Sequence, residues 1–173
     1  MLSLKRTLAG LVMSFAAATA LAQSTPDVLI KQVSSEVIDT IKADKSLQTG
    51  DTSKIIALVD AKVMPHVNFQ RMTASAVGRN WRTATPEQQK RLQEEFKTLL
   101  VRTYAGALTQ VKDQTVQLKP MRAAAEDTEV VVRTEVKGKG EPIQLDYRLE
   151  KADAAWKIYD VNVLGVWLVE NYR

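Results

Sequence analysis

The sequence predicts an α+β fold, with N-terminal helices and one long helix packed on a strongly curved antiparallel sheet. Two observations lead to this prediction. Residues 28–111 repeat apolar side chains at helical spacing. Residues 130–150 alternate apolar and polar side chains around the turn Gly138-Lys139-Gly140, as an antiparallel hairpin does. Because the helices come first and the strands second, we expect the sheet to curl around the long helix.

Residues 1–22 are expected to be a cleavable signal peptide. Lys5 and Arg6 precede an apolar run, and Ala20-Leu21-Ala22 has the small-x-small pattern that signal peptidase cuts. Cleavage there leaves one domain, residues 23–173, and lowers the formal net charge from +4 to +2. An exported chain without cysteine is typical of the bacterial periplasm, and the near balance of charge argues against a nucleic-acid partner.

Four helices are expected before the sheet. The first three cover Val28–Ala43, Ser53–Val63 and Phe69–Gly78. The fourth begins at Thr85-Pro86-Glu87-Gln88, where a hydroxyl N-cap, a proline at the first position and a glutamine at the third form a capping box. We expect this long helix to end near Lys112.

The second half of the chain is expected to be strands. Residues 130–137 and 143–150 form the hairpin, and Thr115–Met121 is a weaker strand. Ala155–Val163 is a further strand whose apolar side changes midway. That change predicts a β-bulge or a strand that is covered on both faces.

Metal and hydrolase chemistry have little support in the sequence. His66 is the only histidine and cysteine is absent, so a metal site would have carboxylate ligands alone, and we expect none. No GxSxG motif accompanies His66, which we interpret as structural or exposed. The glycines of the hairpin turn do not form a phosphate-binding loop.

Asp160 is the candidate for a catalytic carboxylate. Asp160 shares a strand face with Trp156 and Ile158, so we expect it to point inward. With Tyr147 or Tyr159 it would then form the acid–base pair of a cone-fold isomerase or hydrolase. The other reading is a carboxylate that accepts hydrogen bonds from backbone N–H groups, which we favour because the pattern shows no second titrating partner.

The cluster Arg79-Asn80-Trp81-Arg82 also has two readings. It is either a solvated helix end with Trp81 in the core, or a rim where Arg79 and Arg82 meet a lipid phosphate. The many apolar side chains leave a similar choice between a filled core and a lined cavity. Periodicity gives the face on which a residue lies but not its depth.

Several segments together resemble the MlaC family of periplasmic phospholipid carriers. They lie between Asp27 and the last residue. The most specific are Pro65-His66-Val67-Asn68-Phe69-Gln70-Arg71-Met72, Val77-Gly78-Arg79-Asn80-Trp81-Arg82 and Thr85-Pro86-Glu87-Gln88-Gln89. The match continues through Phe96, Leu99-Leu100-Val101-Arg102-Thr103-Tyr104, Trp156-Lys157-Ile158-Tyr159-Asp160-Val161, Gly165-Val166, Leu168-Val169 and Asn171-Tyr172-Arg173. Members of this family usually continue into a C-terminal helix. We therefore expect that helix to be missing here, and Trp167 stands where relatives tend to have a small residue.

The resemblance implies a nuclear-transport-factor-like cone with a deep apolar pocket and no catalytic residue or cofactor. It also implies a monomer that carries glycerophospholipid as cargo. Its expected partners are an outer-membrane lipoprotein–porin complex and an inner-membrane ABC transporter complex with an MCE-domain subunit. The cargo would pass between the two membranes and maintain outer-membrane lipid asymmetry.

The lipid is expected to contact apolar side chains of the third helix, the long helix, the inner sheet face and the C-terminal segment. These are Phe69, Met72, Val77, Trp81, Phe96, Leu100, Tyr104, Val132, Leu145, Tyr147, Val161 and Val166. Arg79 and Arg82 are the expected headgroup rim.

Overall fold

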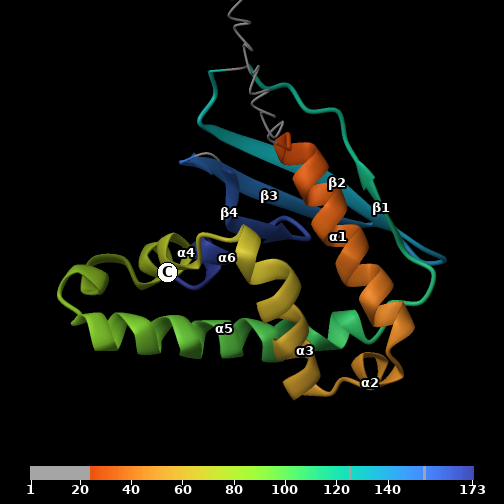
Figure 1. The fold of residues 1–173 in the computed structure, drawn as a ribbon, viewed down its shortest axis with the longest axis horizontal. Helices are drawn as coiled ribbons and strands as arrows, with labels where there is room; N and C mark the ends of the chain where they lie inside the picture. Colours follow the sequence, from red (N-terminus) through yellow and green to blue (C-terminus); the bar gives the residue numbers. More distant parts are fainter. Residues whose placement is uncertain (1–23, 125, 154) are drawn as a thin grey trace, which may run out of the picture.

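Five antiparallel strands form one sheet, in the order β1-β2-β3-β4-β5, and helices lie on one side of it (Figure 1). The structure is a computed structural model that describes residues 24–124, 126–153 and 155–173. The predicted α+β fold class is confirmed. The expected signal peptide lies outside the described residues.

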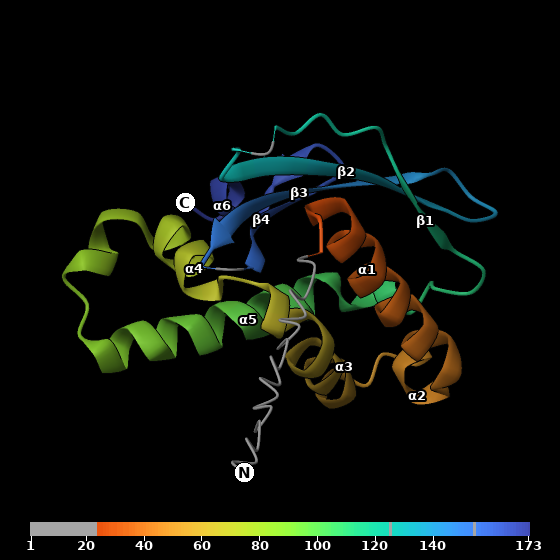
Figure 2. The ribbon, with the colours of Figure 1, turned by 45° about the horizontal axis from the view of Figure 1, so that its top comes forward.

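The strands follow the chain as a meander, and each pairs with the next. Their bounds are β1 Thr115–Leu118, β2 Glu129–Lys137, β3 Ile143–Ala152, β4 Ala155–Val163 and β5 Val166–Trp167. The sheet is strongly bent, as β2 and β3 show in Figure 2. The bend makes one face concave, and α1, α3 and α5 lie on that side, whereas α6 contacts side chains of the opposite face.

The helices also follow the predicted order. Their bounds are α1 Pro26–Ala43, α2 Lys45–Gln48, α3 Thr52–Leu58, α4 Phe69–Val77, α5 Pro86–Leu108 and α6 Leu168–Asn171. A π-helical turn, Val59–Val63, and two 3-10 turns, Met64–His66 and Gly78–Arg82, connect them. The capping box is present, since Gln88 N–H donates to Thr85 and the Gln88 side chain accepts from the Thr85 N–H. Among the described residues, no helix combines the length and the apolar character that crossing a membrane requires.

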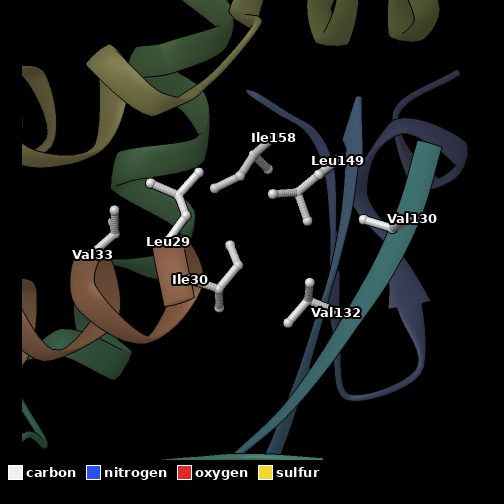
Figure 3. Packing of buried hydrophobic residues seen from close by; sticks show 7 residues of the cluster. All are labelled: Leu29, Ile30, Val33, Val130, Val132, Leu149 and Ile158. Carbon is white, nitrogen blue, oxygen red and sulfur yellow. The ribbon is translucent and has the colours of Figure 1, made fainter. Parts of the chain in front are cut away.

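The sheet is covered by α1 rather than by the long helix. Leu29, Ile30 and Val33 of α1 pack on the inner face of the sheet, as Figure 3 shows. Helix α5, whose 23 residues span about 35 Å, packs instead against α3 and α4. The long helix faces the same side of the sheet, since Leu100 of α5 packs in the cluster that includes Val161 of β4. Helix α1 makes the closer contact with the sheet and presents more buried aliphatic side chains than α5 does.

Two further apolar clusters hold the helices together. One joins α1, α2, α3 and the C-terminal half of α5, with Ile41 and Ile55 each 1% exposed. The other joins α4 and α5 through Phe69 and Phe96, whose stacked rings lie 5.8 Å apart. Tyr172, after α6, meets Phe96 edge to face, so the end of the chain is part of this cluster.

A β-bulge interrupts β4, which is one of the two outcomes that the change of apolar side predicted. Ile158 opposes Leu149 of β3, whereas Asp160 opposes Arg148, so Tyr159 is an extra residue on β4. Val161 and Val163, beyond the bulge, therefore share the inner face with Ile158. Asp160 and Asn162 face outward.

Strands β4 and β5 are joined by a two-residue turn in which both residues have positive φ. Leu164 has φ 52° and Gly165 has φ 91°, as in a type I′ turn. Asparagine or glycine is usual at the first of these positions. A leucine there costs about 1–2 kcal/mol, because its Cβ approaches the following carbonyl oxygen.

Candidate functional site

The inner face of the sheet has a filled half and an open half. In the filled half, under α1, four side chains are no more than 9% exposed: Val130, Val132, Leu149 and Ile158. Four further apolar side chains on the same face remain partly exposed: Leu145, Tyr147, Val161 and Val163. Of these, Tyr147 and Val161 pack against the margin of the filled half. We call these four residues the open inner face.

Strand register places the open inner face as two cross-strand pairs. Leu145 opposes Val163, and Tyr147 opposes Val161. Leu145 and Val163 lie outside all three packed clusters of the described residues. Partly exposed apolar side chains gathered on a concave surface are suited to an apolar ligand, since binding removes them from water.

Tyr147 adds a polar anchor at the centre of this face. Burial raises the pKa of its phenol, although Ser34 and Thr134 hydrogen-bond its hydroxyl. The phenol therefore stays neutral at physiological pH. Tyr147 presents an uncharged ring that is suited to contact with hydrocarbon.

Helix α5 supplies the facing side. Leu100 belongs to the same packed cluster as Val161 of β4, so this part of α5 lies opposite the sheet. Tyr104, one turn further along, is partly exposed, and its hydroxyl is hydrogen-bonded to Tyr172. Burial is the main cause of the raised pKa of Tyr104.

The expected lipid contacts are thus distributed over three environments. Leu100, Tyr104, Leu145, Tyr147 and Val161 lie at the open inner face or opposite it. Phe69, Met72, Phe96 and Val132 are buried inside packed clusters. Val77 and Trp81 lie at the α4–α5 end of the molecule, and Val166 opposes Val163 at the margin of the open inner face. Lipid contact by each of these residues stays a prediction.

The arginines expected at the headgroup rim lie at the α4–α5 end of the molecule. Arg79 and Arg82 are exposed on the 3-10 turn Gly78–Arg82, near the end of α5 that lies farthest from β1 (Figure 1). A groove of about 600 Å³ separates this turn from the first half of α5, with Val77 and Leu92 among its lining residues. The structure therefore does not bring these arginines together with the open inner face.

The expectation that Asp160 points inward is wrong, because the bulge turns it to the outer face. Its side chain is fully buried there and accepts hydrogen bonds from the N–H groups of Val161 (2.9 Å) and Val169 (3.1 Å). It also pairs with Arg148 at 3.0 Å. Asp160 and Tyr147 thus lie on opposite faces of the sheet, which removes this acid–base pair.

Tyr159 does not complete the alternative pair either. Its hydroxyl donates to Glu129 at 3.2 Å, and the guanidinium of Arg71 lies 3.6 Å from the centre of its ring. Arg71 also binds Glu129 at 2.8 Å and contacts Glu150. Tyr159 is therefore part of a polar link between α4 and the outer face of the sheet. Among the described residues, no group of three or more His, Asp or Glu side chains could hold a metal ion.

We predict that Asp160 acts in stability and not in lipid binding. Asp160→Ala leaves two buried N–H groups unpaired and should cost about 2–4 kcal/mol of unfolding free energy, measured by urea denaturation. Asp160→Asn keeps an acceptor and should cost about 1 kcal/mol. Both variants should retain the lipid content of the wild type. Loss of lipid from a folded Asp160→Asn variant would contradict this assignment.

The same residue gives a pH dependence with a definite sign. Burial raises the pKa of Asp160 in the folded protein, despite its N–H donors and Arg148. The folded state therefore holds this proton to higher pH than the unfolded chain does. Its contribution to stability falls as pH rises through the raised pKa. Asp160→Asn should flatten that part of the stability profile.

Sequence reasoning missed Val163 and Ser34. Val163 could have been found, because it continues the alternation of Tyr159 and Val161 in β4. Ser34 could not, since a serine on a helix gives no signal that it reaches a tyrosine hydroxyl on a strand.

The chain is an α+β protein whose bent sheet presents partly exposed apolar side chains on its concave face. The sequence model of the family described as MlaC protein matches residues 31–173. The chain therefore belongs to the MlaC family, as its sequence segments indicated. The names of the matched relatives describe binding and transport, so the expectation of a protein that is not an enzyme is confirmed.

Individual relatives support the same assignment. The chain is 26% identical over 157 residues to the intermembrane phospholipid transport system binding protein MlaC of Haemophilus influenzae, covering 88% of this chain and 73% of that one. It is 27% identical over 171 residues to the toluene tolerance protein ttg2D of Pseudomonas putida, covering 98% and 79%. Among solved structures, the phospholipid-binding protein from Ralstonia solanacearum in complex with a phospholipid matches with a TM-score of 0.83 and 50% identity. That match covers 86% of this chain and 83% of the other.

Proposed function

We propose that this protein is a periplasmic carrier of glycerophospholipid, which holds acyl chains between the open inner face and α5. The observation that carries the proposal is the open inner face itself, which presents four partly exposed apolar side chains on a concave surface. It gains weight because a relative of the same fold and 50% identity was solved with a phospholipid bound.

The energetics of acyl-chain burial fit a carrier rather than a pump. Two acyl chains contain about 30 methylenes, and removing them from water contributes roughly 25 kcal/mol at about 0.8 kcal/mol each. A bilayer offers nearly the same gain, so transfer from membrane to protein is close to neutral. The direction of transport must then come from a partner that consumes energy.

The proposed route runs between the outer and inner membranes and maintains outer-membrane lipid asymmetry. The proposed partners are an outer-membrane lipoprotein–porin complex and an inner-membrane ABC transporter complex with an MCE-domain subunit. The name of the Haemophilus influenzae relative, which includes an intermembrane transport system, supports this assignment. The predicted signal peptide supports export to the periplasm.

We predict one glycerophospholipid per chain in protein purified from the periplasm. Native mass spectrometry should show the complex, and organic extraction should release phospholipid at a 1:1 ratio. The intact mass should correspond to a chain that begins at Gln23, after cleavage of the signal peptide. A natively folded protein that yields no stoichiometric lipid would contradict the carrier and favour an adaptor with a filled core.

A further inference from the structure

A small apolar patch lies where the sheet's inner face reaches solvent. It consists of three side chains: Ile143, 40% exposed, Leu164, 68% exposed, and Val166, 48% exposed. The Leu164 N–H donates to the Gln144 carbonyl at 3.2 Å, which holds the β4–β5 turn beside the start of β3. We call these three residues the tip patch.

The tip patch continues the open inner face without a polar break. Val166 opposes Val163, and Val163 opposes Leu145 on the same face. Ile143 lies two residues before Leu145 on β3 and therefore also faces inward. An acyl chain can thus pass from solvent to Tyr147 and Val161 along aliphatic side chains alone.

Leu164 is the residue that calls for an explanation. It has positive φ at a turn position where asparagine or glycine would be relaxed, and it is the most exposed of the large apolar side chains in the described residues. Because this side chain stays largely in water, it adds little to the stability of the fold. Such outliers point to a function that keeps them.

From this continuity, exposure and strain we infer that the tip patch inserts into the surface of a phospholipid bilayer and is the point through which acyl chains enter and leave. The inference rests on the proposed function, since it gives the entry point for the same cargo. Leu164 and Val166 would sit among the acyl chains just below the headgroups. The open inner face would then receive a chain that never crosses water.

The variant Leu164→Asn provides the test, because asparagine favours positive φ and removes the exposed aliphatic group. The mature protein is mixed with phosphatidylethanolamine/phosphatidylglycerol vesicles that carry a fluorescent phospholipid and no protein. Wild-type protein should float with the vesicles and exchange lipid. Leu164→Asn should lose flotation and exchange lipid at least about tenfold more slowly, while its midpoint of thermal unfolding stays the same or rises by a few degrees.

The matched control is Leu99→Gln, which removes an exposed leucine (46%) from α5, away from the tip patch. It should float and exchange as the wild type does. A second variant, Ile143→Thr with Val166→Thr, should reproduce the loss seen with Leu164→Asn. The inference is overturned if Leu164→Asn floats and exchanges like the wild type, or if its defect appears only when a membrane-protein partner is present.

The two proposals fail in different ways. Absence of lipid from cell-purified wild-type protein counts against the carrier, and flotation still reports on bilayer contact at the tip patch. If the wild-type protein carries lipid and Leu164→Asn exchanges lipid with protein-free vesicles at the same rate, the carrier proposal stands. The proposed entry point at the tip patch is then wrong.

Discussion

Leu100→Trp is expected to remove most of the bound phospholipid while the domain stays folded. Leu100 lies on α5 in the cluster that contains Val161, opposite the open inner face, and it is only partly buried. A tryptophan there occupies space that the acyl chains would use. We expect the lipid-to-protein ratio after purification to fall about fivefold or more, measured by organic extraction and native mass spectrometry.

The neighbouring residue gives a matched control. Leu99 is 46% exposed, so Leu99→Trp adds the same group to the same helix turn without filling a packed position. It should keep wild-type lipid content. If Leu100 instead belongs to a filled core, overpacking should lower the stability of delipidated Leu100→Trp by roughly 1–3 kcal/mol and leave bound lipid unchanged. That result would remove Leu100 from the site.

Leu149→Ala is expected to be the most destabilising single truncation on the inner face. Leu149 is 0% exposed between α1 and the sheet, so its loss removes buried aliphatic contacts and leaves a cavity. The expected cost is about 2–5 kcal/mol of unfolding free energy, measured by urea denaturation of lipid-free protein. The lipid content of the folded fraction should change little.

Leu145→Ala makes the comparison direct, since Leu145 is the same residue type on the same strand and face. It is partly exposed and lies outside the packed clusters, so we expect a cost of only about 1 kcal/mol. Leu145→Ala should instead lower the affinity of the protein for lipid. Equal destabilisation by the two truncations would show that the inner face is filled throughout and would contradict the open inner face.

Much of the architecture follows from local sequence signals. The capping box at Thr85 marks the start of α5 at the correct residue, and alternation in residues 130–150 predicts the central hairpin. The end of α5 at Leu108, four residues before the predicted one, has a weaker signal because the apolar stripe continues through Val111 after the helix stops. Helix α2, with four residues, is too short to show a period.

The site was less predictable, because depth and sidedness depend on tertiary packing. Leu145 and Leu149 have the same periodicity, yet one is partly exposed and the other is buried, since α1 crosses only part of the sheet. Asp160 was assigned to the wrong face because strict alternation was carried through the strand from Ile158. The change of apolar side was consistent with a bulge. Only the position of the bulge at Tyr159 shows that Asp160 faces outward.

The extra residue at Tyr159 also has a consequence for how relatives of this chain can diverge. Removing that single residue would close the bulge and leave the faces unchanged, because Ile158 and Asp160 already oppose consecutive residues of β3. Val161 and Val163 would still face inward, and Asp160 and Asn162 would still face outward. Strict alternation through the intact strand would instead exchange the two faces beyond Ile158. An alignment gap of one position here is thus compatible with the same interior, provided that the homologue also lacks the bulge.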